Sequence, residues 1–352
     1  MEEGFITLVP LDKVAPGMKA GRTVYDEKGR VLLLAGQELD SKIIKRLARF
    51  GVMSMYLQIP VENENGCRNG GHPADLIRGA TRQKAIHEVK KVMYRVIRQK
   101  NTSIRKLEKV VLTIINELLA LDEIIINLID IRTLNHYDFC HCVNVCVFSL
   151  IIGISMGYNR ESLLNLGMGA ILHDLGKLKI PRKILLKREP LTSEEYAAVV
   201  RHTWYGYEAL SRYPNVDQRA KQVVLLHHER FNGRGYPFGL RGKAIPDFAR
   251  IAAVCDVYDA LITDRIYRRR YSFAEANRIL VADQDYFDPE VVTILLGHVC
   301  NYPPGTLVKL DSGQVGIVTE TLAWERRLPA TLESGIKIVD QGIGQKLIEV
   351  FK

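Results

Sequence analysis

The stretch Asn159-Arg-Glu-Ser-Leu-Leu-Asn-Leu-Gly-Met-Gly-Ala-Ile-Leu-His-Asp-Leu-Gly-Lys177 decides how the centre of this chain folds. Asn159 is a favoured N-cap, and the apolar residues after it recur at helical spacing, which predicts a helix that runs to His173. His173 and Asp174 therefore stand side by side where an apolar helix ends. At that position we expect the two polar side chains to point into a cavity, and we do not expect them to pack in the core.

Helical patterns continue on both sides of this stretch. An apolar stripe at i, i+3, i+4 and i+7 covers residues 107–119, and we interpret it as a packing surface. Thr192-Ser-Glu-Glu195 is a capping box in front of a further helix, which we expect to carry His202. Another predicted helix, over 247–263, carries Asp256 and Asp259. Residues 74–302 are thus predicted to form one helical domain.

Both ends of the chain have a different character. Residues 1–62 alternate short β-like runs, at 5–9, 21–25, 31–34 and 52–59, with one helix over 41–50. Residues 63–73 lack apolar periodicity and are interpreted as a linker. Residues 303–352 contain four short predicted strands, at 306–310, 314–319, 335–339 and 346–350. The predicted fold class is therefore mainly α, with small β-rich modules at the N- and C-terminal ends.

Composition narrows the class of protein. The chain has 352 residues, 47% hydrophobic and 25% charged, which is typical of a globular protein with two or three domains. The apolar runs are too short for a membrane span, and the N-terminus lacks the pattern of a signal peptide. The six cysteines are then expected to be reduced thiols in the cytoplasm. A net charge of +9 favours an anionic partner without choosing among nucleotides, nucleic acid and membrane surfaces.

Five histidines and two aspartates form the candidate chemistry of the helical domain. Each histidine taken singly is more often a surface or hydrogen-bonded residue than a ligand, but together they suit divalent metals such as Mn, Fe and Zn. Asp174 has two carboxylate oxygens and can bridge two ions, and two ions about 3.5–4 Å apart can clamp a phosphoester. The candidate ligands are His141, His173, Asp174, His202, His227, His228 and Asp256.

The loop after the second histidine pair is the most specific segment. It reads His227-His-Glu-Arg-Phe-Asn-Gly-Arg-Gly-Tyr-Pro237, and its closely spaced glycines predict a tight turn next to the metal pair. Such a turn can present Arg234, Gly235 and the Tyr236 ring to a ligand. The cysteines around His141, by contrast, lie on an apolar helix and are interpreted as small core residues.

Taken together, these motifs resemble the HD-GYP family of metal-dependent phosphohydrolases. His173-Asp-Leu-Gly-Lys177 corresponds to the HD part, and Gly233-Arg-Gly-Tyr-Pro237 corresponds to the GYP part. The resemblance extends in order over residues 135–289, from Tyr137-x-Phe139-x-His141 to the segment that begins at Asp256. It implies an HD-type helical bundle with a dinuclear site that uses Fe or Mn. The implied reaction is hydrolysis of cyclic di-GMP to pGpG or GMP, by in-line attack of a metal-bridging hydroxide.

The resemblance also implies roles for single residues. One metal would be bound by His141, His173, Asp174 and Asp256, and the other by Asp174 as a bridge with His202, His227 and His228. Lys177 would act on the scissile phosphate and assist proton transfer to the leaving oxygen. Asp259, one helical turn after Asp256, would orient a ligand or Lys177. The substrate-binding positions would be Arg234, Gly235, Tyr236, Arg265 and Arg268.

Two departures from the family pattern bear on these expectations. Ile266 stands after Arg265 where relatives often have proline, which affects the shape of that loop. Family members with three metals have a glutamate four residues before the first histidine, where this chain has Tyr137. A neutral phenol is a poor ligand beside two cations, so two metals per chain are expected, with Tyr137 near the site. Asp138 lies three residues before His141, and a helix offset would be needed to bring its carboxylate towards the site.

Three other functions account for part of the sequence pattern. A hydrolase of another cyclic dinucleotide, such as cyclic GMP-AMP, would have the same metal ligands. A receptor that binds cyclic di-GMP without cleaving it is disfavoured because all seven ligands are present. A nucleic-acid-binding protein explains the charge but not the metal set, since the basic residues look scattered apart from 268–270. The β modules could bind signalling partners or form a homodimer.

Overall fold

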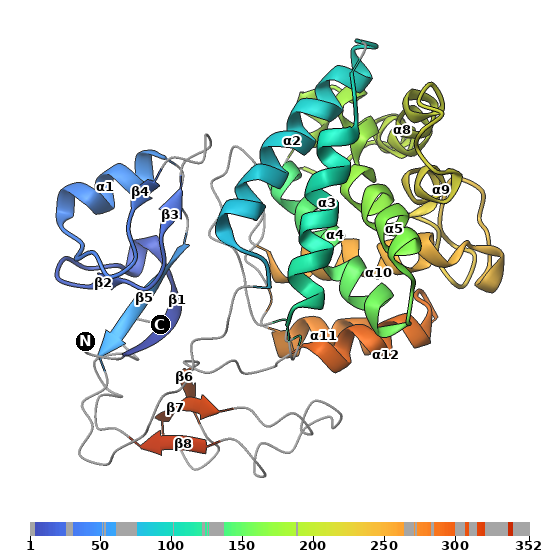
Figure 1. Ribbon diagram of the computed structural model, residues 1–352. Helices are drawn as coiled ribbons and strands as arrows, with labels where there is room; N and C mark the ends of the chain where they lie inside the picture. The colour runs from blue at the N-terminus through green and yellow to red at the C-terminus, as the bar shows by residue number, and fades with distance from the viewer. Residues whose placement is uncertain are drawn as a thin grey trace. The chain divides into compact units, whose positions relative to one another are not determined.

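The computed structural model describes residues 4–25, 31–50, 52, 54–60, 76–100, 102–121, 124, 126, 137–187, 189–263, 271, 273–282, 285–299, 307–309, 315–320 and 337–340. The chain divides into two compact units (Figure 1). One unit comprises residues 76–124 and 138–298, and the other comprises 1–75, 125–137 and 299–352. The predicted linker at 63–73 lies outside the described residues.

The N-terminal part is built on a three-stranded antiparallel sheet in the order β1-β5-β2. β1 (Gly4–Pro10) pairs with β5 (Ser54–Pro60) over its full length, from Gly4 opposite Pro60 to Pro10 opposite Ser54. β2 (Lys19–Ala20) lies on the other side of β5. β3 (Val24–Tyr25) and β4 (Val31–Leu33) form a separate two-stranded sheet. The expected strand at 21–25 is thus shortened, and β2 was not expected.

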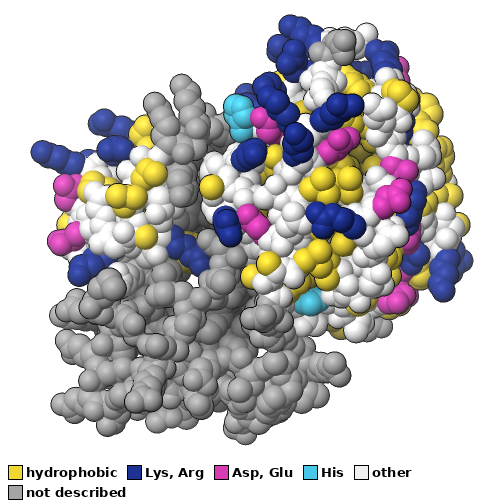
Figure 2. Space-filling model, viewed as in Figure 1, with side chains coloured by type: hydrophobic (Ala, Val, Ile, Leu, Met, Phe, Trp, Pro, Cys, Tyr) yellow, Lys and Arg dark blue, Asp and Glu magenta, His cyan; other side chains and the backbone are white. Residues whose placement is uncertain are grey.

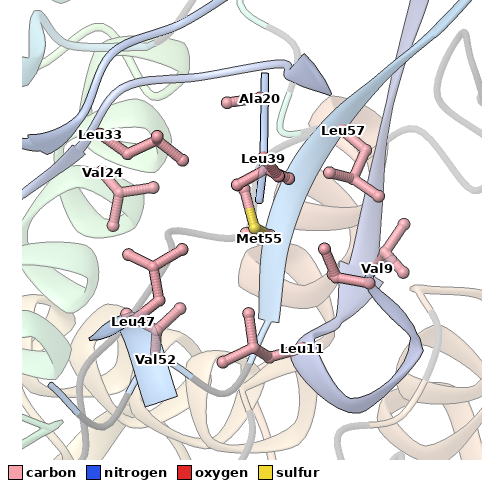
Figure 3. Packing of buried hydrophobic residues seen from close by; sticks show 11 residues of the cluster. Val9, Leu11, Ala20, Val24, Leu33, Leu39, Leu47, Val52, Met55 and Leu57 are labelled. Atoms are coloured by element: carbon pink, nitrogen blue, oxygen red, sulfur yellow. The ribbon is translucent and has the colours of Figure 1, made fainter. Parts of the chain in front are cut away.

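One helix covers this sheet. α1 (Ser41–Arg49) begins after Asp40, whose side chain accepts a hydrogen bond of 2.6 Å from the backbone amide of Ile43, and it follows the short 3-10 helix η1 (Leu11–Lys13) in the chain. Apolar side chains from the strands and the helix meet in one core, in which Leu47 and Met55 are fully buried (Figure 3). This core consists of Val9, Leu11, Val14, Ala20, Val24, Leu33, Leu39, Leu47, Val52, Met55 and Leu57. The β-rich N-terminal part is thereby confirmed.

Three short strands are described in the C-terminal part. β6 (Leu307–Lys309), β7 (Val315–Glu320) and β8 (Lys337–Asp340) form an antiparallel sheet in the order β6-β7-β8. They fall on three of the four strands expected from the sequence. The fourth, at 346–350, lies outside the described residues, so the C-terminal module as a whole stays a prediction.

The second unit is helical, as predicted. Its longer helices in chain order are α2 (Gly79–Ile97), α3 (Arg105–Leu119), α4 (Tyr137–Ser155), α5 (Arg160–Leu172), α7 (Ser193–Val200), α8 (His202–Ser211), α9 (Gln218–Leu226), α10 (Asp247–Ile262), α11 (Phe273–Ala282) and α12 (Pro289–His298). The short helices are η3 (Leu175–Lys179), α6 (Arg182–Leu185) and η4 (Gly242–Ala244). The stripe predicted at 107–119 is the buried face of α3, apart from the exposed Leu119. Within the described parts of the chain, no helix is both long enough and apolar enough to traverse a bilayer.

Local caps explain where the functional helices start and end. Asn159 caps α5 by accepting a 2.9 Å hydrogen bond from the amide of Ser162, as predicted. The capping box of Thr192 and Glu195 is also confirmed at the start of α7. The prediction that this same helix carries His202 is wrong. The helix is interrupted at Arg201, and His202 is the first residue of α8.

Candidate metal centre

Helix ends deliver most of the candidate ligands to one buried place. His173 is the C-cap residue of α5, His227 is the C-cap residue of α9, and His202 begins α8. His141 and Asp256 come from within α4 and α10. Residues from five separate stretches therefore meet, although more than 110 positions separate the first from the last. The full set is His141, His173, Asp174, His202, His227, His228 and Asp256, and all but His228 are buried.

Asp174 lies at the centre of this set. Two groups of possible ligand atoms lie within 4.8 Å of one another: Asp174 with His202, His227 and His228, and Asp174 with His141 and His173. Its Oδ1 is 3.6 Å from His202 Nε2 and 3.8 Å from His227 Nε2, and its Oδ2 is 3.3 Å from His173 Nε2. One carboxylate thus faces both groups with different oxygens, which is consistent with a dinuclear site.

Backbone carbonyls orient three of the histidines. The Nδ1 atom of His173 lies 2.7 Å from the Ala170 carbonyl oxygen, and the Nδ1 atom of His202 lies 2.6 Å from that of Val199. Nδ1 of His227 lies 3.1 Å from the Val223 carbonyl. A carbonyl can only accept, so each Nδ1 carries the proton and each Nε2 presents a lone pair to the centre.

Unpartnered polar atoms test whether the cluster suits a metal. Among the described residues, His173 Nε2 and Asp174 Oδ1 are buried without a hydrogen-bond partner. His202 Nε2 and His227 Nε2 lie only 3.4 Å apart, although both are acceptors in the tautomers just derived. Buried atoms of this kind cost free energy unless something satisfies them, and converging lone pairs repel each other. A divalent cation removes both costs, so the donor set fits a metal.

Electrostatics distinguishes His141 from the other histidines. Its Nε2 lies 3.0 Å from Asp256 Oδ1, and its Nδ1 lies 2.7 Å from Asp259 Oδ2. Burial alone would lower the pKa of His141, but hydrogen bonds to the two aspartates outweigh it and raise this pKa to about 9. Burial alone would raise the pKa of Asp256, whereas His141 holds it well below its usual value.

His202, His227 and His228 are set up as neutral imidazoles around an anion. Burial lowers the pKa of His202 to about 3, against the opposing attraction of Asp174. Burial likewise lowers the pKa of His227 and, strongly, that of His228. Asp174 stays ionised, because His173 and Lys177 hold its pKa low despite burial. Neutral imidazole and ionised carboxylate are the forms that bind a metal.

Two glycines allow the elements of the site to approach. A Cβ atom on Gly176, in η3, would lie 1.8 Å from the carbonyl oxygen of His202, and one on Gly206 would lie 2.6 Å from Val224 Cγ1. No side chain can be accommodated at such distances. The bare backbones therefore let η3 pack directly on α8, which brings Asp174 close to His202.

The loop after His228 is anchored by a residue that sequence reasoning quoted without a role. Glu229 is 1% exposed, and its carboxylate accepts hydrogen bonds from the amides of Phe238 (2.8 Å) and Leu240 (2.9 Å). The loop thereby folds back so that the Tyr236 ring stacks on His228, with 4.7 Å between centroids and 27° between planes. Tyr196 of α7, also missed, makes an edge contact with Tyr236 at 6.4 Å. The sequence signal for Glu229 was an acidic residue directly after a histidine pair.

The other predicted site residues have different outcomes. Lys177 Nζ lies 2.6 Å from Asp174 Oδ2 and its side chain is 31% exposed, so it borders both the cluster and solvent. Arg234 is exposed, and no described contact links its side chain to the cluster. Arg265 and Arg268 lie outside the described residues, as does the side chain of Tyr137.

Comparison with known proteins agrees with this geometry. A family model described as HD domain matches residues 144–291. The solved structure of Bd1817, a HDG"Y"P protein from Bdellovibrio bacteriovorus, matches with a TM-score of 0.50 and 16% identity over 82% of this chain and 98% of that chain, which bears on the fold alone. Residues 144–291 of the helical unit therefore match an HD domain.

Relatives with curated names narrow the class further. The cyclic di-GMP phosphodiesterase PA4108 of Pseudomonas aeruginosa is 37% identical over 196 residues, which is 56% of this chain and 47% of that protein. The 3'3'-cGAMP-specific phosphodiesterase 2 of Vibrio cholerae is 40% identical over 129 residues, or 36% of this chain and 25% of that protein. The resemblance to the HD-GYP family is confirmed, and the matched part spans less than half of either relative.

Proposed function

We propose that this chain is a metal-dependent phosphodiesterase that hydrolyses cyclic di-GMP. The position of Asp174 carries the proposal, because its two oxygens face two groups of histidines within 4.8 Å. Relatives that are named cyclic di-GMP phosphodiesterases, such as the protein of Pseudomonas aeruginosa, supply the substrate class. Two bound cations would supply Lewis acidity and an activated water at a phosphodiester.

The proposed ligand set is the one expected from the sequence. His141, His173 and Asp256 bind one ion, His202, His227 and His228 bind the other, and Asp174 binds both. Hard carboxylate and borderline imidazole donors without thiolate suit Fe or Mn, the metals that the resemblance to the HD-GYP family implies. Asp256 is proposed for one site, although its Oδ2 also lies 3.9 Å from His228 Nδ1. We propose two ions per chain, with Tyr137 near but not bound.

The remaining residues handle the substrate. Lys177, which is partly exposed and pairs with Asp174, contacts the scissile phosphate and holds a proton for the leaving oxygen. Tyr236, stacked on His228, offers one ring face to a guanine base, and Arg234, Gly235, Arg265 and Arg268 complete the proposed binding surface. Products are pGpG or GMP.

Anaerobic reconstitution tests the activity directly. The full chain is loaded with Mn or Fe, its metal content is measured, and the products formed from cyclic di-GMP are separated by chromatography. We expect cleavage that a chelator abolishes and that either metal restores. Intact substrate after loading with either metal would refute the enzyme proposal and favour a receptor.

A second candidate is hydrolysis of cyclic GMP-AMP. The observation in its favour is the 40% identity to the Vibrio cholerae enzyme, whose name gives that specificity. The metal ligands cannot distinguish the two substrates, because only the bases differ. Competition between equal concentrations of the two dinucleotides tests which one is preferred. A kcat/KM ratio in favour of cyclic GMP-AMP would reassign the substrate.

The proposed domain division follows the sequence analysis. Residues 1–62 form the β-rich N-terminal module, 63–73 the linker, 74–302 the helical domain and 303–352 the C-terminal β module. The sheets of β1, β2 and β5 and of β6 to β8 support small β elements at both ends. These modules are proposed to bind signalling partners or to form a homodimer, which light scattering of the full chain tests.

A further inference from the structure

A chain of four polar side chains runs from helix α2 to the metal centre. Arg82 Nη1 donates a 2.7 Å hydrogen bond to Asn144 Oδ1, and Asn144 Nδ2 donates a 2.6 Å bond to Asp259 Oδ1. Asp259 Oδ2 in turn lies 2.7 Å from His141 Nδ1. Asn144, Asp259 and His141 are buried, whereas Arg82 is half-buried.

The chemistry of the two end groups fixes the direction of each bond. A guanidinium can only donate, so it forces the amide oxygen of Asn144 to face Arg82 and the amide nitrogen to face Asp259. An ionised carboxylate can only accept, so Asp259 takes both the amide proton and the His141 Nδ1 proton. His141 is then oriented with Nε2 toward Asp256 and Asp174, from which it lies 3.0 Å and 3.8 Å.

His141 differs in this respect from the histidines that backbone carbonyls orient. Its Nδ1 is held by a buried carboxylate, and a buried carboxylate needs other donors to stay ionised and fixed. Asn144 is a close donor of this kind, since its Nδ2 lies 2.6 Å from Asp259 Oδ1, whereas the hydroxyl of Thr263 lies 3.4 Å from the same oxygen. Without a charged donor behind it, the Asn144 amide could turn over and present its oxygen to Asp259, which would be repulsive.

We propose that Arg82 is a positioning residue for the metal bound by His141, acting through Asn144 and Asp259. The inference rests on the proposed metal centre. It also places α2, which lies before the residues matched by the HD domain model, among the elements that determine metal affinity.

Titration of the full chain with manganese tests this inference. Electron paramagnetic resonance measures the free ion, so the assay reports metal binding and does not depend on enzymatic turnover. Arg82→Met keeps the length of the side chain and removes its donors. We expect the manganese affinity of one of the two sites to fall by about tenfold, which is the lower end of the range for residues that hold a metal ligand in place. Arg82→Lys keeps a cationic donor and should restore most of the affinity. Lys84→Met, at an exposed position of the same helix, is the matched control and should bind manganese like the wild type.

A double-mutant cycle separates positioning from a general loss of stability. In an Asn144→Leu background, Arg82→Met should weaken manganese binding by less than about twofold, because the path is already broken. Equal weakening in both backgrounds, or unchanged binding in Arg82→Met, would overturn the inference. If Arg82→Met does not fold, Arg82→Lys and Asn144→Leu test the inference in its place. Wild-type manganese affinity in Asn144→Leu would then overturn the inference. A wild type that binds no manganese would instead refute the metal centre itself.

A basic groove lies between α2 and α3. The groove has a volume of about 350 Å³, and five exposed cationic side chains with one carboxylate, Glu88, line it. Figure 2 shows Lys and Arg side chains gathered over this face. Helical spacing brings them together, since Lys91 and Arg95 are four residues apart. The cations are Lys91, Arg95, Arg105, Lys106 and Lys109.

The groove is built for a multivalent anion. Within the described residues, none of its five cations forms an ion pair, and one carboxylate, that of Glu88, stands against five positive charges. The hydroxyl groups of Thr102 and Ser103 add donors to the wall. The volume is that of a small-molecule site, and no aromatic residue lines it to stack a base, which disfavours single-stranded nucleic acid. We infer that the groove binds a small molecule that carries a chain of phosphate groups.

Calorimetric titration of the full chain with inorganic tripolyphosphate tests this second inference. We expect one molecule to bind per chain and the combined change Arg95→Glu and Lys106→Glu to weaken it by more than tenfold. Lys42→Glu with Lys45→Glu on α1 alters the net charge equally and should bind like the wild type. Equal weakening in both pairs, no weakening in the groove pair, or tighter binding of a single-stranded oligonucleotide would overturn the inference.

Discussion

Substitution of Gly176 by alanine tests whether the missing side chain at this position is what lets η3 and α8 lie in contact. The added methyl group would lie 1.8 Å from the carbonyl oxygen of His202 and 2.7 Å from the amide nitrogen of Gly206. Real Cβ contacts essentially never fall below 3.0 Å, so the two backbones must separate by the difference, at least about 1.2 Å. Neither of these neighbours is a flexible side chain that could turn away.

The separation acts directly on the metal centre. Asp174 lies two residues before Gly176, and its Oδ1 is 3.6 Å from His202 Nε2. Metal–ligand distances tolerate deviations of about 0.2 Å, so a shift of this size should remove the ion bound by His202. Overpacking of this kind costs about 1–3 kcal/mol, and each kcal/mol lowers Tm by about 2–4 °C in a domain of this size. Metal analysis after reconstitution and thermal unfolding measure the two effects.

Gly297 provides the matched control. A Cβ atom at Gly297, in α12, would meet no atom within 4 Å. Alanine there should leave metal content unchanged and raise stability by up to about 1 kcal/mol, because glycine is a poor helix former. If Gly176→Ala binds both ions and melts at the wild-type temperature, the close approach of η3 and α8 is not what holds the site.

The other predictions concern the centre itself. Asp174→Ala should reduce bound metal towards zero, whereas Asp256→Ala should mainly empty one site; equal, small losses on elemental analysis would contradict the bridging role. Lys177→Ala should keep both metals and lower kcat by about 10²-fold, and wild-type turnover would remove Lys177 from the mechanism. Since the pKa of His141 is raised to about 9, its imidazole is protonated at pH 7 in the metal-free chain and should release a proton when metal binds. Manganese affinity at that site should then rise from pH 6 to about pH 9 and level off above it, and calorimetry in buffers of different ionisation enthalpy should detect the proton; a pH-independent affinity would contradict this assignment.

Much of the site could be predicted because its residues stand at helix ends that short-range signals mark. The Asn159 cap and the apolar spacing after it locate the end of α5, and hence His173 and Asp174. The break at Arg201 could not be seen in the same way, because both Arg201 and the residues beside it are compatible with a continuous helix. The separation of α7 from α8 is a matter of tertiary packing, which brings His202 against Gly176.

Contacts between distant segments were also beyond the sequence. Arg82 and Asn144 are 62 residues apart, and no periodicity links them. The same holds for the basic groove, because its cations are spread along two helices and look scattered until α2 and α3 pack together. Glu229 was visible next to His228, but its role requires the folded loop, in which two amides return to its carboxylate.

The carbonyl contacts of His173, His202 and His227 bear on how freely this domain can vary in sequence. The partners of these three imidazoles are main-chain atoms of Ala170, Val199 and Val223, and every amino acid supplies the same carbonyl. Side chains at those three positions can therefore drift without altering the tautomer of a ligand, as long as the helices persist. Divergence can accumulate around these three ligands, where a substitution behind a ligand leaves its orientation intact, whereas the orientation of His141 depends on which side chains stand behind it.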